Sequence, residues 1–369
     1  MAKIKKSIVF VVGTRPNFIK AAPILKQFEK LKHIRTVLIH TGQHFDYEMS
    51  RLFFKDLNIR KPDYNLNING ATHGELTARM LSGLEKIFMA IKPEMIIAAG
   101  DVDSTLAAAL AASKLCIPVA HVEAGLRSFD MMMPEEVNRI ITDRLSDLLF
   151  THSPEAKDNL VREGISPEKI YFVGNVMIDM LKTMLGKARN ASYLKKYGLK
   201  KGNYALLTLH RPSNVDEKRV LENLLLTIRK ISKMVPVIFP VHPRSKAKIS
   251  GYKLEHIVEG SNIIMTAPLG YMENLSILKD AKFVLTDSGG IQEETTYLHI
   301  PCLTLRENTE RPVTAAIGTN TIVGNNRKII LTMTRSIMKG SYKPGKVPKF
   351  WDGNSAQRIY EIIKRRLGS

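Results

Sequence analysis

Apolar and polar positions along the chain predict a repeated order of strand and helix. Short runs of β-branched and other apolar residues alternate with longer stretches in which apolar residues recur every three or four positions. The first pattern is typical of buried strands and the second of amphipathic helices. The predicted strands are residues 7–12, 36–40, 95–99, 118–122, 148–151 and 170–173 in the first half, and 204–208, 236–241, 263–265, 283–286, 302–305 and 321–323 in the second. The clearest predicted helices are residues 18–31, 104–114, 135–145, 218–232, 291–298 and 355–367.

These patterns predict an α/β fold with two domains. Continuous apolar strands separated by helices indicate parallel sheets that are covered on both faces. A chain of 369 residues also exceeds what a single hydrophobic core usually supports. The two halves share the same order of elements, and the basic, polar stretch 187–203 is the expected region between them. We therefore predict one domain over residues 1–174, a second over 175–354, and a final helix over 355–369.

Polar clusters follow the predicted strands with unusual regularity. They are GTRPN after Val12, GDVDST after Ala99, EAGLRSFD after Val122, LHRPSN after Thr208, HPRS after Val241, DSGGIQEE after Thr286 and RENTERP after Leu305. The carboxyl ends of parallel strands share one edge of a sheet, where open α/β folds bind ligands. Loop polarity alone explains any one cluster, but it explains seven at one edge much less well. If the two halves face each other, these loops form one polar cleft.

A phosphate site is predicted where Ser288, Gly289 and Gly290 precede a helix. Glycines let the backbone approach a ligand, and the free N–H groups of a helix N-terminus attract anions. The alternative is an ordinary helix start with Ser288 as its cap. Glu293 and Glu294 suit the first turn of that helix on electrostatic grounds alone, although one of them could bind ribose hydroxyls.

Arg15, Arg311 and His210 are candidate partners of a diphosphate. The arginine guanidinium offers a forked, permanently charged set of donors. A single arginine is more often a surface residue, so these three gain weight only because each follows a predicted strand.

Asp101, Glu123 and Glu135 are the candidates for proton transfer. Asp101 and Glu123 follow neighbouring predicted strands and are therefore expected to converge. Glu135 stands in MPEEVNR, at the start of a predicted helix, where an acidic residue is also favourable without any catalytic role.

Several other classes of protein are disfavoured. No G-x-G-x-x-G motif follows a strand, so a nicotinamide cofactor is not expected, and no Cys/His cluster has metal-site spacing. No apolar run approaches the length of about 20 residues that a membrane span requires. The net charge of +20 raises the possibility of a nucleic-acid or polyanion binder, but the basic residues are spread along the chain. We interpret them as a solvated basic surface that also attracts a diphosphate.

Taken together, the motifs resemble those of the non-hydrolysing UDP-N-acetylglucosamine (UDP-GlcNAc) 2-epimerases. The matching segments run in family order from Val9 to Gly324 and are GTRPNFIKAAP, GDVDST, HVEAGLRSFD, MPEEVNR, GNVMID, HRPSN, TDSGGIQEE and ENTERP with AIGTN. The resemblance implies a glycosyltransferase-B-like fold, with two Rossmann-like domains facing across a cleft and the last helix returning to the first domain. It also implies a homodimer that binds a UDP-amino sugar and needs neither a metal nor a redox cofactor. The two cysteines, Cys116 and Cys302, are predicted to be reduced thiols, which indicates a cytoplasmic protein.

Carried over by motif, the resemblance also implies roles for single residues. Arg15 and Lys20 would bind substrate, and Asp101, Glu123 and Glu135 would be the acid/base residues. His210 would contact the nucleotide sugar near the diphosphate, as a member of the catalytic set. The residues implied to hold UDP or complete its site are Ser288, Gly289, Gly290, Glu294 and Arg311. The implied reaction is elimination of UDP to a 2-acetamidoglucal, followed by its re-addition.

Two departures from the family pattern leave the sugar open. Val102 and Asp103 stand where many members have two threonines, and Ser213 replaces an acid in HRPSN. The segment around MPEEVNR also resembles members that act on UDP-2,3-diacetamido-2,3-dideoxyglucuronate. A hydrolysing 2-epimerase and a glycosyltransferase on the same scaffold remain further alternatives.

Overall fold

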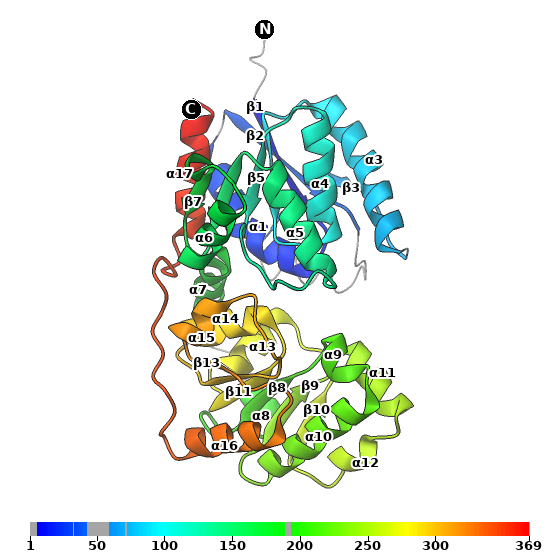
Figure 1. Ribbon diagram of the computed structural model, residues 1–369, viewed down its shortest axis with the longest axis vertical. Helices are drawn as coiled ribbons and strands as arrows, with labels where there is room; N and C mark the ends of the chain where they lie inside the picture. The colour runs from blue at the N-terminus through cyan, green and yellow to red at the C-terminus, as the bar shows by residue number, and fades with distance from the viewer. Residues whose placement is uncertain (1–5, 32, 43–58, 71, 189–192, 369) are drawn as a thin grey trace. The chain divides into compact units, whose positions relative to one another are not determined.

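The chain forms two compact units in a computed structural model that describes residues 6–31, 33–42, 59–70, 72–188 and 193–368 (Figure 1). Unit 1 comprises Met1–Lys182 and Lys349–Ser369, and unit 2 comprises Thr183–Pro348. The chain passes from unit 1 to unit 2 inside helix α7 (Val176–Ala188). It returns to unit 1 before helix α17 (Ser355–Arg366). The domain boundaries predicted from the sequence, at 174/175 and 354/355, remain predictions.

Unit 1 is built on a parallel sheet of seven described strands in the order β3-β2-β1-β4-β5-β6-β7. The strands are β1 (Lys6–Val12), β2 (Ile34–His40), β3 (Tyr64–Asn65), β4 (Met95–Ala99), β5 (Val119–Val122), β6 (Leu148–Thr151) and β7 (Ile170–Phe172). With α7 and α17, the described helices are α1 (Arg15–Phe28), α3 (His73–Ile91), α4 (Asp103–Lys114), α5 (Pro134–Leu145), α6 (Pro154–Arg162) and a 3-10 turn at Pro167–Lys169.

Unit 2 repeats this plan on a parallel sheet of six described strands in the order β10-β9-β8-β11-β12-β13. The strands are β8 (Ala205–Thr208), β9 (Val237–Pro240), β10 (Ile263–Thr266), β11 (Phe283–Thr286), β12 (Cys302–Thr304) and β13 (Asn320–Ile322). The helices are α8 (Tyr193–Lys196), α9 (Pro212–Val215), α10 (Lys218–Ser232), α11 (Pro243–Gly251), α12 (Glu255–Val258), α13 (Tyr271–Leu278), α14 (Gly289–Tyr297), α15 (Pro312–Ala316) and α16 (Arg327–Met338).

Both sheets have the strand order of the Rossmann fold. In each unit the third, second and first strands lie side by side and are followed by the fourth, fifth and sixth. The order reverses between β1 and β4 in unit 1 and between β8 and β11 in unit 2, and ligands of such sheets bind beside this point. The predicted α/β fold with two Rossmann-like domains is therefore confirmed.

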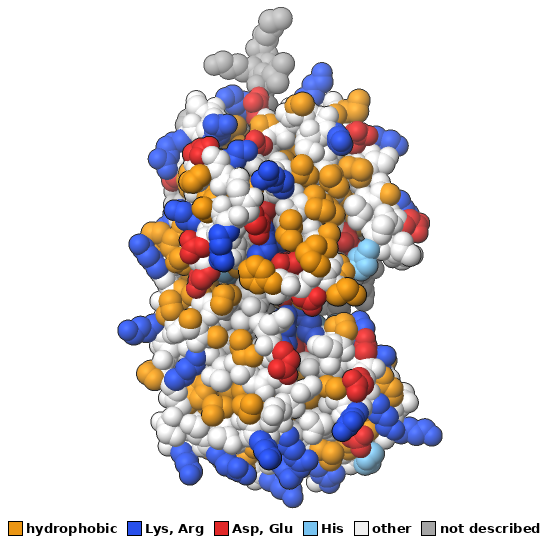
Figure 2. Space-filling view, in the orientation of Figure 1, with side chains coloured by type: hydrophobic (Ala, Val, Ile, Leu, Met, Phe, Trp, Pro, Cys, Tyr) orange, Lys and Arg blue, Asp and Glu red, His pale blue; other side chains and the backbone are white. Residues whose placement is uncertain are grey.

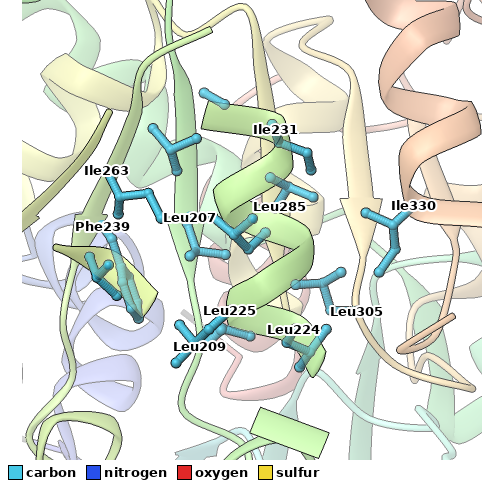
Figure 3. Close-up of a cluster of buried hydrophobic side chains, with 14 of the residues drawn as sticks. Leu207, Leu209, Leu224, Leu225, Ile231, Phe239, Ile263, Leu285, Leu305 and Ile330 are labelled. Atoms are coloured by element: carbon cyan, nitrogen blue, oxygen red, sulfur yellow. The ribbon is translucent and has the colours of Figure 1, made fainter. Parts of the chain in front are cut away.

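The core of unit 2 shows how an amphipathic helix covers the sheet. Helix α10 buries Leu221, Leu224, Leu225, Ile228 and Ile231 completely, at the three- and four-residue spacing of one helix face. Figure 3 shows several of these side chains packed against apolar residues of the strands. Each fully buried aliphatic side chain stabilises the fold by roughly 1.5–3 kcal/mol.

The C-terminal segment belongs to unit 1. Helix α17 packs on α1, where the rings of Phe28 and Tyr360 lie 5.2 Å apart. Trp351 is 1% exposed, and its indole nitrogen donates to the carbonyl of His152 at 3.0 Å. The last segment is thus anchored to the same unit as the first strands.

The surface of the chain carries its positive charge in many places. Figure 2 shows Lys and Arg side chains on both units, interspersed with acidic and apolar ones. They are most numerous at the end of unit 2 that carries α10, α12 and α16.

Candidate active site

Four charged side chains meet at the carboxyl ends of β4 and β5 in unit 1. Glu123 directly follows β5, and its Oε2 lies 2.8 Å from Nζ of Lys20, which comes from α1. Arg139 of α5 is bound to Asp101, and its Nη2 lies 3.9 Å from Oε1 of Glu123. The structure therefore brings together three predicted site residues. Lys20 contacts Glu123 directly, and Arg139, which was not predicted, joins Asp101 to Glu123.

The backbone around these residues is shaped for this contact. A Cβ on Gly100 would lie 2.8 Å from Nζ of Lys20, so glycine leaves room for the lysine to reach Glu123. Asn17 donates to the carbonyl of Ala99 at 2.6 Å, which ties α1 to the end of β4. Glu123 has a φ of +73°, a left-handed value that non-glycine residues rarely adopt.

Asp101 and Glu123 differ in their access to solvent. The side chain of Asp101 is 17% exposed, whereas that of Glu123 is 2% exposed. Lys20 and Arg139 balance the two negative charges within a buried cluster, as buried carboxylates require. Two carboxylates in different environments are suited to different steps of proton transfer.

The two adjacent acids of α5 have different surroundings. Glu136 is 2% exposed and accepts from the backbone nitrogen of Ser128 at 2.8 Å and from that of Phe129 at 3.1 Å, so it holds the preceding loop. Glu135 is half-buried and lies one helical turn before Arg139, on the same face of the helix. This places Glu135 on the side of α5 that meets Asp101, and its catalytic role stays a prediction.

His210 of unit 2 is held by an acid that the sequence reasoning missed. Its Nδ1 lies 2.9 Å from Oδ1 of Asp287, which directly follows β11 and is completely buried. Burial acts to raise the pKa of Asp287, but the hydrogen bond and charge of His210 and two backbone N–H groups lower it below its ordinary value. The ionised carboxylate fixes the ring through Nδ1, an arrangement common for functional histidines. An acidic residue at a strand end was the available signal for Asp287.

A second histidine, also missed, lies beside His210. The rings of His210 and His242 are 5.6 Å apart. Burial, and then the charge of His210, lower the pKa of His242. Its Nδ1 accepts from the backbone nitrogen of Arg244, so His242 also caps α11.

The predicted phosphate site forms the start of α14. Ser288 is the N-cap residue and Gly289 begins the helix. A Cβ on Gly289 would lie 2.5 Å from Nη1 of Arg311, so the guanidinium rests against the helix N-terminus. Gly290 follows in the first turn, and the site joins His210 through Asp287, the residue before Ser288. Free backbone N–H groups beside a guanidinium favour a phosphate group.

Acidic side chains hold the arginine in place. Arg311 donates from Nε to Glu293 at 2.8 Å and from Nη1 to Glu310 at 2.8 Å. Glu294 is 5% exposed and accepts from the hydroxyl of Tyr271 at 3.2 Å. Of the two acids that follow the glycines, Glu293 therefore orients Arg311, while the ribose role of Glu294 stays a prediction.

Arg15 is the first residue of α1, and its side chain lies outside the described part of the structure. Among the described residues, no three His, Cys, Asp or Glu side chains are arranged to hold a metal ion. The same residues include no helix that is both long and apolar enough to cross a membrane.

Comparison with known proteins identifies the family. The profile of the family described as UDP-N-acetylglucosamine 2-epimerase matches residues 26–364. A UDP-N-acetylglucosamine 2-epimerase of Methanococcus maripaludis is 42% identical, over 96% of this chain and 98% of that protein. A UDP-2,3-diacetamido-2,3-dideoxy-D-glucuronate 2-epimerase of Pseudomonas aeruginosa is 40% identical, over 97% of this chain and 99% of that protein.

A solved structure agrees with both comparisons. The UDP-GlcNAc 2-epimerase of Methanocaldococcus jannaschii, crystallised in complex with UDP-GlcNAc and UDP, superposes with a TM-score of 0.90. It is 42% identical and covers 97% of this chain and 99% of its own. The chain therefore belongs to the UDP-N-acetylglucosamine 2-epimerase family of carbohydrate isomerases, as the sequence motifs indicate.

Proposed function

We propose that this chain interconverts UDP-GlcNAc and UDP-N-acetylmannosamine (UDP-ManNAc) without net hydrolysis, and that Asp101 and Glu123 move the proton at C2. The observation that carries the proposal is the charged cluster at the ends of β4 and β5, in a chain of this family. Two carboxylates can serve the two faces of one carbon, one removing a proton and the other returning it.

The chemistry explains why UDP must leave. The C2 hydrogen of the sugar is not acidic, because no carbonyl carbon lies beside C2 in the ring. A carboxylate takes the C2 proton while the C2–H electron pair forms the C1=C2 double bond. In the same step the C1–O bond breaks, and its electron pair leaves with the β-phosphate oxygen of UDP. Protonation of C2 on its other face and return of UDP to C1 give the epimer.

The residues of unit 2 suit the departing nucleotide. We assign Ser288, Gly289, Gly290 and Arg311 to the diphosphate, because a helix N-terminus and a guanidinium stabilise the negative charge that develops there. His210 donates to the diphosphate, held in place by its carboxylate partner.

The remaining roles come from the family motifs. Glu294 accepts from the ribose hydroxyls, Arg15 and Lys20 bind substrate, and Glu135 assists proton transfer. Lys20 also neutralises Glu123.

Exchange of the C2 hydrogen in deuterated water tests the proposal. UDP-GlcNAc incubated with the enzyme should yield UDP-ManNAc that carries deuterium at C2, as followed by proton NMR. Asp101→Asn and Glu123→Gln should each lower the exchange rate by about 100-fold or more, since removal of a general acid or base costs roughly 10²–10⁴-fold. The control is Glu75→Gln, which changes a carboxylate that is 58% exposed on α3.

The same experiment separates the alternatives. Free UDP and N-acetylmannosamine would accumulate with a hydrolysing enzyme, and a glycosyltransferase would leave C2 protonated. UDP-2,3-diacetamido-2,3-dideoxyglucuronate as a second substrate tests the other relative's activity, and a higher kcat/KM on it would reassign the sugar. Near-normal exchange in both Asp101→Asn and Glu123→Gln would remove their proposed roles.

We also propose a cytoplasmic homodimer. Three of the exposed large apolar side chains of unit 1 are close together in sequence: Phe129 (75%), Met131 (63%) and Met132 (90%). Such clusters often mark interfaces. Cys116 and Cys302 are free thiols, which suits a reducing compartment. Light scattering should give twice the chain mass of 41.5 kDa, and a single-chain mass would refute the dimer. Fractionation of the source cells tests the compartment.

A further inference from the structure

A completely buried histidine, His121 of β5, has an acceptor beside each of its ring nitrogens. Its Nδ1 lies 2.6 Å from Oδ1 of Asp143, and its Nε2 lies 2.8 Å from the carbonyl oxygen of Gly100. A carboxylate and a carbonyl are both acceptors, whereas a neutral imidazole has only one N–H group. With Asp143 ionised, both hydrogen bonds form only when each ring nitrogen carries a proton.

Asp143, the carboxylate that contacts His121, is also bound by an arginine. Burial acts to raise the pKa of Asp143, but the charges of His121 and Arg127 lower it, so this carboxylate is ionised. Arg127 lies 2.8 Å from Oδ2 of Asp143 and also binds Glu163 through two hydrogen bonds of 2.7 and 2.6 Å. The side chain of Glu163 is 36% exposed, so this chain of contacts runs from the buried His121 to the surface.

This group holds both acid/base residues in place. Gly100, whose carbonyl receives the His121 bond, directly precedes Asp101, and its own N–H donates to the carbonyl of Val122 at 2.9 Å. Glu123 follows Val122, and Asp143 accepts from the backbone nitrogen of Gly125, two residues further, at 3.1 Å. One histidine–carboxylate pair therefore ties together the two loops that carry the charged cluster.

We propose that His121, as a buried imidazolium bound to Asp143, is a positioning residue for the epimerisation. By holding the carbonyl of Gly100 it sets the separation and orientation of Asp101 and Glu123. The inference rests on the proposed function, because it assumes that these two carboxylates move the C2 proton. His121 has no exposed surface, so it acts through its neighbours.

Two substitutions separate the two hydrogen bonds. The amide nitrogen of His121→Gln falls near the position of Nε2 and can still donate to Gly100. That of His121→Asn falls near Nδ1 and can donate only toward Asp143. We expect kcat to fall about 100-fold in His121→Asn and about 10-fold in His121→Gln, with KM nearly unchanged, because small displacements of catalytic groups cost up to about 10²-fold. The matched control is Ser146→Ala, which removes a buried hydrogen bond at the C-terminal end of α5, from the cap residue Ser146 to the carbonyl of Thr142.

A spectroscopic measurement reads the protonation directly. Long-range proton–nitrogen NMR of the wild-type enzyme at neutral pH should show two protonated ring nitrogens for His121. Thermal melting and UDP binding establish that the variants are folded, and the NMR result decides the inference if both variants unfold.

The outcomes are distinguishable. A neutral His121 ring, a folded His121→Asn with wild-type kcat, or equal losses in the Asn and Gln variants would overturn the positioning role. Asp101→Asn and Glu123→Gln are measured beside them. If those two retain C2 exchange, the proposed function fails at its acid/base residues, whatever the His121 variants show.

Discussion

Removal of one carboxylate should loosen the C-terminal helix. Asp179 of α7 accepts from the backbone nitrogens of Ser355 at 3.2 Å and Ala356 at 2.8 Å, the first two residues of α17. It therefore caps a helix that begins 176 residues later, since the side chain of Asn354, at the N-cap position, makes no capping bond. Loss of a cap costs about 0.5–2 kcal/mol, and a hydrogen bond to a charged group contributes about 1.5–3 kcal/mol. We expect Asp179→Ala to lower the free energy of unfolding of unit 1 by about 2–3 kcal/mol.

Asp179→Asn should be milder, and its cost should depend on pH. Burial, against the two backbone hydrogen bonds, raises the pKa of Asp179 above its ordinary value. The folded state then binds this proton more tightly than the unfolded state, so the wild type gains stability as pH falls through the window from the raised pKa toward the ordinary one. The asparagine variant lacks this gain. We expect its deficit to be about 1 kcal/mol at neutral pH and larger at acidic pH.

The single tryptophan of the chain makes the assay specific. Trp351 is buried close to the start of α17, so its fluorescence in a urea titration reports the release of this segment. With a slope near 2 kcal/mol/M, the midpoint of Asp179→Ala should fall by about 1 M. The control is Glu361→Gln, a substitution on α17 away from its cap, which should shift stability by less than about 0.5 kcal/mol. An unchanged midpoint in Asp179→Ala, or an equal loss in Asp179→Asn at every pH, would refute the capping argument.

Two further predictions concern unit 2. Gly289→Ala places a Cβ 2.5 Å from Nη1 of Arg311 and so displaces the guanidinium, which loses a charge-assisted hydrogen bond. The affinity for UDP, measured by calorimetry, should therefore fall about tenfold or more. The control is Gly251→Ala, whose added Cβ meets open space and which should bind UDP normally. Asp287→Asn removes the charge that orients His210 and should lower kcat/KM by about 10–100-fold in steady-state assays. Folding lowers the pKa of Asp287, so its ionised carboxylate stabilises the folded state at pH values above the ordinary pKa. This stabilisation is lost as the pH falls through the lowered pKa. Acid denaturation should therefore be shallower in Asp287→Asn, and an identical acid curve would contradict this linkage.

The sequence predicts the positions of the strands better than it predicts which side chains contact one another. Apolar runs marked the observed strands closely, except β3 (Tyr64–Asn65), whose two residues are exposed and leave no apolar signal. The strand ends located Asp101 and Glu123 because a parallel sheet gathers its carboxyl ends at one edge. The contact of Glu123 with Lys20 crosses about a hundred residues and depends on which strands are neighbours, which periodicity does not report.

Buried charged residues on helices were the hardest to predict. Arg139 is completely buried and Asp143 is 1% exposed, yet in the α5 pattern each looks like an ordinary surface charge. Their four-residue spacing puts both on one face of the helix, which is the signal that could have singled them out. Their function depends on partners supplied by β5 and the loops, and those partners become visible only when the sheet is assembled.

The charge balance of the unit 1 cluster bears on how the proposed elimination proceeds. In the resting state, Lys20 and Arg139 neutralise Asp101 and Glu123. When one carboxylate takes the C2 proton, the cluster gains a net positive charge at the moment when negative charge develops on the leaving diphosphate. The gain favours C–H and C1–O cleavage in the same step, because a positive site stabilises that transition state more than the neutral ground state. In the proposed mechanism, the two cations therefore have a role beyond neutralising buried acids, since they make proton removal and UDP departure assist each other.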